Sequence, residues 1–201
     1  MSDIKIKICG LRRPEDIAFV NAVKPDYIGF IFADGRRRTV TPRQAADLKA
    51  DLDPGIRSVG VFLDQSLSWI EETARTSGID LIQLHGHESN TFVQEIQQKT
   101  GLPVIRAFSV ACSADIETAC HSSADYILLD HQIPGSGQSF DWSLLQHISR
   151  PYFLAGGLAP SNLSEALKLQ PFAVDVSSGV ETNGCKDLQK IKEFAALVRG
   201  E

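Results

Sequence analysis

Short runs of β-branched and aliphatic residues recur along the whole chain, and segments with helical spacing separate them. Eight such runs are present: IKIKIC, YIGFIFA, SVGVFL, LIQLHG, VIRAFSV, YILLD, PYFLAGG and AVDVSSG. The segments between them place apolar residues three or four positions apart, as Leu188, Ile191 and Ala195 do in the last one. This alternation predicts a parallel sheet covered by helices.

The number of units selects between the two common forms of such a sheet. Eight units in 201 residues leave about 25 residues for each, which matches the lower size limit of a closed barrel. An open doubly wound sheet usually has about six strands, and its G-x-G-x-x-G fingerprint is missing after the first run, where the chain has CGLRRP. We therefore predict an α/β fold, a (β/α)8 TIM barrel with eight parallel strands and outer helices, formed by residues 1–201 as a single catalytic domain. We expect helices to begin at Pro14, at a capping box of Ser68 and Glu71, and at Pro160.

Composition excludes several classes of protein. Hydrophobic residues make up 43%, charged residues 22%, and the net charge is -5, which is typical of a globular protein and disfavours a nucleic-acid partner. The start, MSDIKIK, has no apolar stretch after basic residues, and the longest apolar run is far too short to span a membrane. We expect a cytoplasmic protein without membrane contact. The four cysteines form no CxxC pair, so we expect reduced thiols rather than a zinc ribbon or a disulfide scaffold.

One face of several predicted strands is polar. Lys7 and Cys9 share a face opposite isoleucines in the first run. Four more runs are divided in the same way. Gln83 and His85 share a face opposite Ile82 and Leu84, and Arg106 is opposite Ile105 and Ala107. Asp130 is opposite Ile127 and Leu129, and Asp175 and Ser177 are opposite Val174 and Val176. A barrel accommodates the split by placing aliphatic side chains outward under the helices and polar ones inward. We expect Lys7 and Asp175, on strands that become neighbours when the barrel closes, to form a structural ion pair.

Four polar residues end predicted strands, at the rim where barrel enzymes build active sites: Cys9, His85, Asp130 and Ser177. Cys9 is either a packed core thiol or a base, whose pKa the surrounding helix N-termini lower toward neutrality. Asp130 is either a helix cap or cation partner, or an acid facing Cys9.

Two further groups carry alternatives. His85 and His87 suggest a metal, but no third ligand has a recognisable spacing, so structural or orienting roles are favoured. The arginines of GRRR, Arg36–Arg38, form either a solvated loop or a fork for a substrate carboxylate.

Glycines follow the last three strands. AGGL after the seventh run and SSGVE after the eighth lie where barrels commonly bind phosphate through backbone N–H groups, although each alone is also a tight turn. GSGQSFDW, after the sixth run, has the composition of a loop that covers a ligand.

These motifs together resemble the phosphoribosylanthranilate isomerase family of tryptophan biosynthesis, over the whole chain. The matching segments are KICGL at 7–11, RTVTP at 38–42, VGVF at 59–62, IQLHG at 82–86, LLD at 128–130, GSGQSFDW at 135–142, AGGLAPSN at 155–162, DVSSGVE at 175–181 and GCKD at 184–187. The family pattern has one arginine where this chain has three, so the carboxylate ligand is one of Arg36, Arg37 and Arg38. His131 stands where the family more often has a small hydroxyl residue.

The resemblance implies an Amadori rearrangement of N-(5-phosphoribosyl)anthranilate into 1-(2-carboxyphenylamino)-1-deoxyribulose 5-phosphate, by general acid-base catalysis and without metal or organic cofactor. Cys9 and Asp130 occupy the base and acid positions, and Arg38 that of the carboxylate ligand. We also expect His85 to contact the substrate. The phosphate cradle implied by the family is formed by Gly156, Gly157, Ser178 and Gly179.

Two alternative functions share several of these features. One is the isomerase of histidine biosynthesis, or a relative acting on both substrates, a group that typically has an aspartate at the end of the first strand, where this chain has Cys9. A barrel that binds a phosphorylated ligand without catalysis would leave the pairing of Cys9 with Asp130 unexplained. We expect a small phosphorylated sugar as the substrate and a monomer or homodimer as the assembly.

Overall fold

A computed structural model describes residues 4–131 and 141–201, and its centre is a closed barrel of eight parallel strands. The strands are β1 (Lys5–Cys9), β2 (Tyr27–Ile31), β3 (Arg57–Phe62), β4 (Leu81–Leu84), β5 (Val104–Val110), β6 (Tyr126–His131), β7 (Tyr152–Leu154) and β8 (Ala173–Val176). Each strand pairs with its neighbours in chain order, and β1 closes the ring by pairing with β8. The predicted barrel is confirmed.

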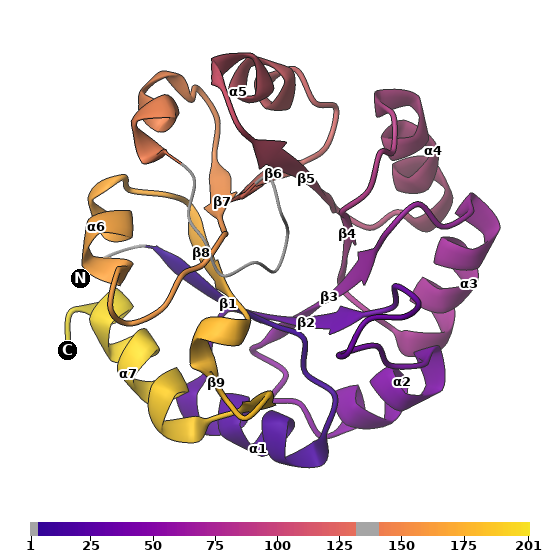
Figure 1. The fold of residues 1–201 in the computed structure, drawn as a ribbon. Coiled ribbons are helices and arrows are strands. Elements are labelled where there is room, and N and C mark those ends of the chain that lie inside the picture. Colours follow the sequence, from indigo (N-terminus) through magenta and orange to yellow (C-terminus); the bar gives the residue numbers. More distant parts are fainter. Residues whose placement is uncertain (1–3, 132–140) are drawn as a thin grey trace.

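Helices surround the ring of strands on the outside (Figure 1). They are α1 (Pro14–Val23), α2 (Pro42–Ala50), α3 (Leu67–Ser77), α4 (Asn90–Thr100), α5 (Ser113–Cys120), α6 (Leu163–Lys168) and α7 (Leu188–Arg199). A 3-10 turn, η1 (Trp142–His147), lies between β6 and β7. A second 3-10 turn, η2 (Ser178–Val180), and a small hairpin of β9 (Glu181–Thr182) and β10 (Cys185–Lys186) lie between β8 and α7.

The apolar interior has two parts, one on each side of the strands. The larger part joins the outward side chains of the strands, such as Ile6 and Ile8, to helix residues such as Ile17 and Val20. The smaller part contains no helix residue and fills the lumen: Tyr27, Val59, Leu81, Ile105, Ala107, Leu128, Phe153, Ala155 and Ala173. Burying each large aliphatic or aromatic side chain contributes about 1.5–3 kcal/mol. The lumen is therefore a packed core rather than an open channel.

The fifth strand has the opposite orientation to the one that the sequence pattern predicts. Ile105 and Ala107 point into the lumen, whereas Arg106 points outward. Its guanidinium lies 4.8 Å from the centre of the Phe108 ring, and Nη1 donates to Asn90 Oδ1 of α4 at 2.9 Å. The arginine reaches a polar partner along the helix surface because its long apolar stem can lie against buried carbon.

Two helix starts also differ from the prediction, whereas α1 begins at Pro14 as expected. Ser66, not Ser68, caps α3 and accepts a hydrogen bond from the backbone N of Trp69. α6 begins at Leu163 rather than at Pro160. Pro160 belongs to the turn before it, which Asn162 fastens by accepting from Ala159 N and donating to Gly157 O, both at 2.9 Å.

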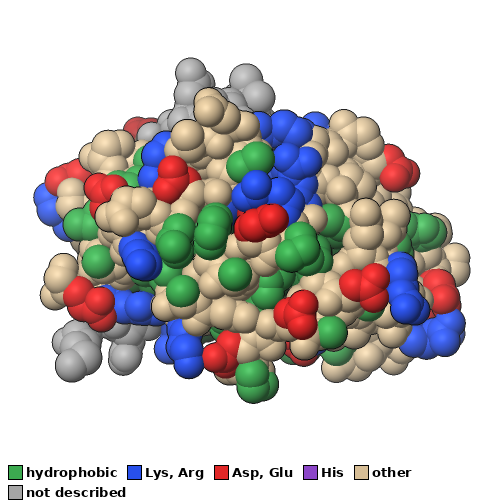
Figure 2. Space-filling view, turned by 90° about the horizontal axis from the view of Figure 1, so that it is seen from below, with side chains coloured by type: hydrophobic (Ala, Val, Ile, Leu, Met, Phe, Trp, Pro, Cys, Tyr) green, Lys and Arg blue, Asp and Glu red, His purple; other side chains and the backbone are tan. Residues whose placement is uncertain are grey.

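The surface carries both signs of charge. On the face in Figure 2, Lys and Arg are interspersed with Asp and Glu, and hydrophobic side chains lie between them. No helix within residues 4–131 and 141–201 has the length and apolar character needed to cross a membrane. All four cysteines are free.

Candidate active site

A pocket opens at the carboxyl end of the strands, and most of the predicted site residues line it. Its empty space, counted to the open mouth, is about 710 Å³. The predicted residues in its lining are Cys9, Arg38, His85, Asp130, Gly156, Gly157, Ser177 and Ser178. Gln83 and Asp175 also contribute to it. β1 and β6, which carry Cys9 and Asp130, are separated by β7 and β8 around the ring, so the two residues enter the pocket from nearly opposite sides.

Cys9 is the last residue of β1 and is 7% exposed. A Cβ atom on the neighbouring Gly29 would lie 2.6 Å from the sulfur, so a residue without a side chain is needed there. Ser177, which directly follows β8, donates from Oγ to the backbone oxygen of Cys9 at 2.9 Å. The signal for Gly29 was present in the sequence as a glycine inside an otherwise apolar strand, which often marks a close approach.

Lys7 and Asp175 form the predicted ion pair below Cys9. Their strands pair with Lys7 directly opposite Asp175, and Lys7 Nζ lies 2.9 Å from Asp175 Oδ2. The Lys7 side chain is completely buried, and burial alone would favour its neutral form. The carboxylate of Asp175 and the nearby Cys9 outweigh burial and raise the pKa of Lys7.

The expected lowering of the thiol pKa is wrong for this structure. Burial raises the pKa of Cys9, and the ammonium groups of Lys7 and Lys186 oppose that effect without cancelling it. The sulfur is shielded from water at the edge of the packed lumen, so desolvation of a thiolate outweighs the cations beside it. Cys9 is therefore a thiol whose ionised form depends on these charged neighbours.

A chain of polar contacts holds Asp130 on the opposite side. Asp130 is 8% exposed in β6, and its Oδ2 lies 3.5 Å from His85 Nε2. Gln83, on β4, places its side-chain nitrogen 2.9 Å from His85 Nδ1. When Gln83 donates to Nδ1, the imidazole carries its proton on Nε2, facing Asp130. His85 therefore lies between the Gln83 amide and the carboxyl group of Asp130.

His87 does not join His85. Its side chain is 96% exposed, and its Nδ1 lies 3.1 Å from Asp64 Oδ2, in the loops after β3 and β4. Within the described part of the chain, no group of three or more His, Cys, Asp or Glu side chains has the arrangement of a metal site.

The three arginines after β2 differ in position. Arg38 lines the pocket with Cys9 and Asp130, and its side chain is 18% exposed. Arg37 is more exposed, at 54% of its side chain, and Arg36 is also exposed. Both Arg37 and Arg38 bind Glu181: Arg38 Nε lies 2.7 Å from Oε1 and Nη2 3.2 Å from Oε2, and Arg37 Nη2 lies 2.6 Å from Oε2.

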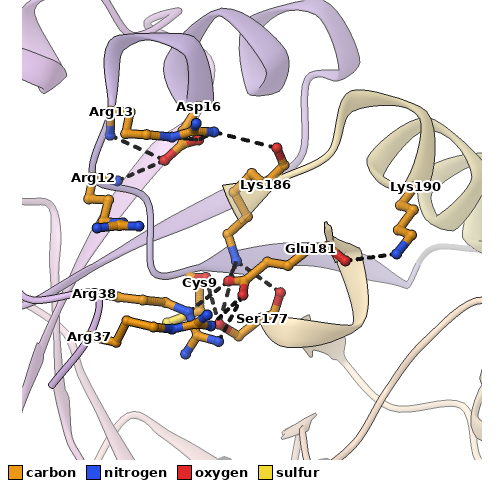
Figure 3. A network of polar contacts seen from close by, with 10 residues as sticks. All are labelled: Cys9, Arg12, Arg13, Asp16, Arg37, Arg38, Ser177, Glu181, Lys186 and Lys190. Atoms are coloured by element: carbon orange, nitrogen blue, oxygen red, sulfur yellow. Dashed lines mark hydrogen bonds and ion pairs between the residues drawn. The ribbon is translucent and has the colours of Figure 1, made fainter. Parts of the chain in front are cut away.

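The hairpin after β8 adds two residues that sequence reasoning missed, Glu181 and Lys186. Lys186 Nζ lies 3.0 Å from Glu181 Oε1 and 2.9 Å from the backbone oxygen of Ser177 (Figure 3). Burial would raise the pKa of Glu181, but Arg38 and Lys186 lower it to about 2. The available signal was the length of chain between the eighth strand and the last helix, which exceeds a plain strand-to-helix turn.

The glycines after β7 and β8 bring two loops close to the pocket. Gly156 and Gly157 have φ of 88° and 62°, a region in which other residues are strained. A Cβ atom on Gly179 would lie 2.0 Å from the backbone oxygen of Leu158, so the loops meet only because this residue is glycine. The polypeptide backbone of both loops thus faces the same end of the pocket.

Two features of the sequence fall partly outside the described residues. Residues 135–140 of the GSGQSFDW segment belong to the part that the structure does not describe. Asp141 and Trp142 are described, and Asp141 caps η1 by accepting from the backbone N of Ser143 at 2.9 Å. His131 ends β6, and its side chain lies outside the described part of the chain.

Comparison with known proteins gives concordant matches. The family model for N-(5'-phosphoribosyl)anthranilate isomerase matches residues 6–196. The enzyme of that name from Endomicrobium trichonymphae is 44% identical over 200 residues, covering 97% of this chain and 98% of the relative.

Two solved structures are similar in both sequence and shape. A phosphoribosyl anthranilate isomerase in complex with reduced 1-(o-carboxyphenylamino)-1-deoxyribulose 5-phosphate has a TM-score of 0.89 and 34% identity, over 98% of this chain and 100% of that one. Monomers generated from the dimeric enzyme of Thermotoga maritima have a TM-score of 0.87 and 34% identity, with the same coverage.

Proposed function

Because the chain belongs to the N-(5'-phosphoribosyl)anthranilate isomerase family, we propose that it catalyses the Amadori rearrangement of N-(5-phosphoribosyl)anthranilate to 1-(2-carboxyphenylamino)-1-deoxyribulose 5-phosphate, a step of tryptophan biosynthesis. The observation that carries the proposal is the placement of a thiol and a carboxyl group on nearly opposite sides of one pocket. The same pocket is lined by Arg38 and by the glycine loops after β7 and β8, which lie beside these two residues.

Asp130 acts first, as the general acid. It protonates the furanose ring oxygen, and the anthranilate nitrogen then expels that oxygen from C1 to give an open-chain Schiff base. His85, held by Gln83, orients the carboxyl group and contacts the substrate from the same side. The proton moves directly from the carboxyl group to the oxygen that leaves C1.

Cys9 acts second, as the general base. Its thiolate removes the proton on C2 of the Schiff base, the electron pair moves toward the iminium nitrogen, and the resulting enolamine relaxes to the ketone of the product. Only protons are transferred in each step, so the proposed reaction uses no metal or organic cofactor. Catalysis depends on holding the sugar between the two residues.

The two ends of the substrate are anionic, and the pocket offers a group for each. We assign Arg38 to the anthranilate carboxylate, because it alone of the three arginines lines the pocket with Cys9 and Asp130. We assign the backbone of Gly156, Gly157, Ser178 and Gly179 to the phosphate. Glycine allows close approach of N–H groups to phosphate oxygens.

The proposal also covers where the protein works and how it assembles. We propose a cytoplasmic enzyme that works as a single barrel domain, either as a monomer or as a homodimer, without a nucleic-acid or membrane partner. The net charge of -5 disfavours a nucleic-acid partner, because the phosphate backbone attracts positively charged proteins. The dimeric assembly is named for the T. maritima relative.

The test supplies phosphoribosylanthranilate to the purified protein and to the variants Cys9→Ala and Asp130→Asn, and follows the rearranged product. We expect turnover by the natural chain and a loss on the order of a hundredfold or more in each variant. Cys112→Ala, which removes an exposed thiol, is the matched control and should keep full activity. EDTA should not change the rate.

Each outcome assigns a role. A variant with an undiminished rate removes that residue from the mechanism. Absence of turnover in the natural chain, with binding of the product analogue, would identify a barrel that binds without catalysis. Turnover of the corresponding histidine-pathway substrate instead would indicate the rival isomerase.

A further inference from the structure

Lys186 is a buried cation that the proposed reaction does not use. It lies on β10 and is 5% exposed, although lysine is almost never fully buried unless it is paired. Its ammonium is held by Glu181 Oε1 at 3.0 Å and by the backbone oxygen of Ser177 at 2.9 Å. Ser177 in turn donates to the backbone oxygen of Cys9, so Ser177 connects Lys186 with the residue that carries the proposed base (Figure 3).

The charges around Lys186 do not cancel. Glu181 is shared by three cations, Arg37, Arg38 and Lys186, so this cluster has a net charge of about +2 from its formal charges. The second ammonium near Cys9, that of Lys7, has its own carboxylate, Asp175, at 2.9 Å. The Lys7 pair is therefore neutral as a unit, whereas Lys186 belongs to a cluster with surplus positive charge.

The other charged groups around Cys9 can be named from each element that meets it. Lys7 precedes it on β1, Asp175 lies on β8, and Lys186 on β10. Arg38, from the loop after β2, and His85 with Asp130, from the opposite side, face the same pocket. Lys7 and Lys186 both favour the thiolate, Asp175 opposes it, and burial opposes it most.

We infer that Lys186 is a positioning residue for Cys9: its ammonium, fixed by Glu181 and Ser177, stabilises the thiolate that removes the substrate proton. The inference rests on the proposed function, in which Cys9 is the base. Without Lys186, the remaining partner of the sulfur is a lysine already neutralised by Asp175. A lysine that served only to anchor the hairpin would leave the ionisation of Cys9 unchanged.

The test measures the ionisation of Cys9 directly. Iodoacetamide reacts with thiolates, and mass spectrometry of the Cys9 peptide separates its alkylation from that of the three other cysteines. In Lys186→Met we expect the pH midpoint of Cys9 alkylation to rise by about one unit or more, which lowers the alkylation rate near neutral pH about tenfold. Lys186→Arg should restore the midpoint toward that of the natural chain.

Lys190→Met is the matched control. Lys190 belongs to the same end of the barrel, at the start of α7, but it donates to the backbone oxygen of Glu181 at 2.7 Å rather than to its carboxylate. Its removal should leave the Cys9 midpoint where it is in the natural chain. A Lys186→Met midpoint equal to that of Lys190→Met would overturn the inference.

Glu181→Gln gives a second measurement that does not depend on the folding of Lys186→Met. It removes a negative charge and keeps the size and an acceptor oxygen of the side chain, so the Cys9 midpoint should fall. A midpoint at or above that of the natural chain, in folded Glu181→Gln, contradicts the inference. If Cys9→Ala retained full isomerase activity, the proposed base would be wrong while the alkylation result still described Lys186.

Discussion

The two sides of the pocket are built differently. The side of β1 and β8 holds Cys9 among buried ion pairs, with Lys7 on Asp175 and Lys186 on Glu181. The side of β4 and β6 holds Asp130 through a row of hydrogen-bonding groups that runs from Gln83 to His85. Polar contacts therefore position the proposed acid, whereas charged groups surround the proposed base.

This difference follows from what each group must do. A carboxylic acid donates its proton to an atom at which it is aimed, and Gln83 and His85 supply polar contacts that position Asp130. A buried thiol must first become an anion, and burial opposes that ionisation unless cations lie nearby. The charged frame around Cys9 is thus a requirement of using sulfur as a base in a dry pocket.

The largest expected effect on stability is at the base side. Lys7→Met leaves Asp175 buried without its cation, and we expect the free energy of unfolding to fall by about 3–5 kcal/mol in urea denaturation. The double variant Lys7→Met, Asp175→Leu should regain most of this loss, because no unpaired charge then remains. A single variant within 1 kcal/mol of the natural chain, which is about the size of an exposed ion pair, would mean that the pair is not buried in solution.

A second prediction concerns acid. The folded pKa of Glu181 is about 2, below its ordinary 4.5, so the stabilisation is complete above about pH 4.5 and is lost as pH falls toward 2. The shift corresponds to about 3 kcal/mol in favour of the natural chain over Glu181→Gln at neutral pH. Unfolding measured from pH 6 to pH 2 should show this difference shrinking, whereas a difference that stays constant would contradict the assigned ionisation.

Arg38→Ala sharpens the comparison at the binding step. Loss of the proposed carboxylate fork should raise KM about a hundredfold with a smaller change in kcat, since the interaction is present in both ground and transition states. Arg36→Ala, which removes an exposed arginine two residues earlier, should change KM less than about threefold. Steady-state kinetics decides the assignment, and a larger effect at Arg36 would move the ligand to that residue.

The smallest effect on stability is expected at the acid side. Gln83 is buried, and its Oε1 has no hydrogen-bond partner among the described residues, so Gln83→Met should change the free energy of unfolding by about 1 kcal/mol or less. The same change frees His85 and should lower kcat roughly tenfold. A destabilisation as large as that of Lys7→Met would erase the contrast between the two sides.

The barrel and the rim of the pocket could be predicted from the sequence, because both depend on local patterns of residues. Alternating strands and helices determine the architecture, and the position of Cys9 and Asp130 at strand ends places both at one mouth. The pairing of Lys7 with Asp175 also followed, because both are inward residues on strands that adjoin after closure.

What the sequence did not predict depends on contacts between distant segments. Alternation divides a strand into two faces but does not say which face is the inner one. Arg106 lies on the outer face, where it donates to Asn90 and contacts the ring of Phe108. The cluster at Glu181 joins distant parts of the chain, since Arg38 and Glu181 are 143 positions apart. The raised pKa of Cys9 arises from burial by the whole rim, which no residue spacing records.

The most direct test of the opposed acid and base is a crystal structure of this protein with the reduced product analogue, the ligand found in a relative. We expect the sugar carbons between the sulfur of Cys9 and the carboxyl group of Asp130, the aromatic carboxylate on Arg38, and the phosphate on the loops of Gly156 and Ser178. A ligand with both Cys9 and Asp130 on one side of its carbon chain, or with its phosphate outside those loops, would contradict the account.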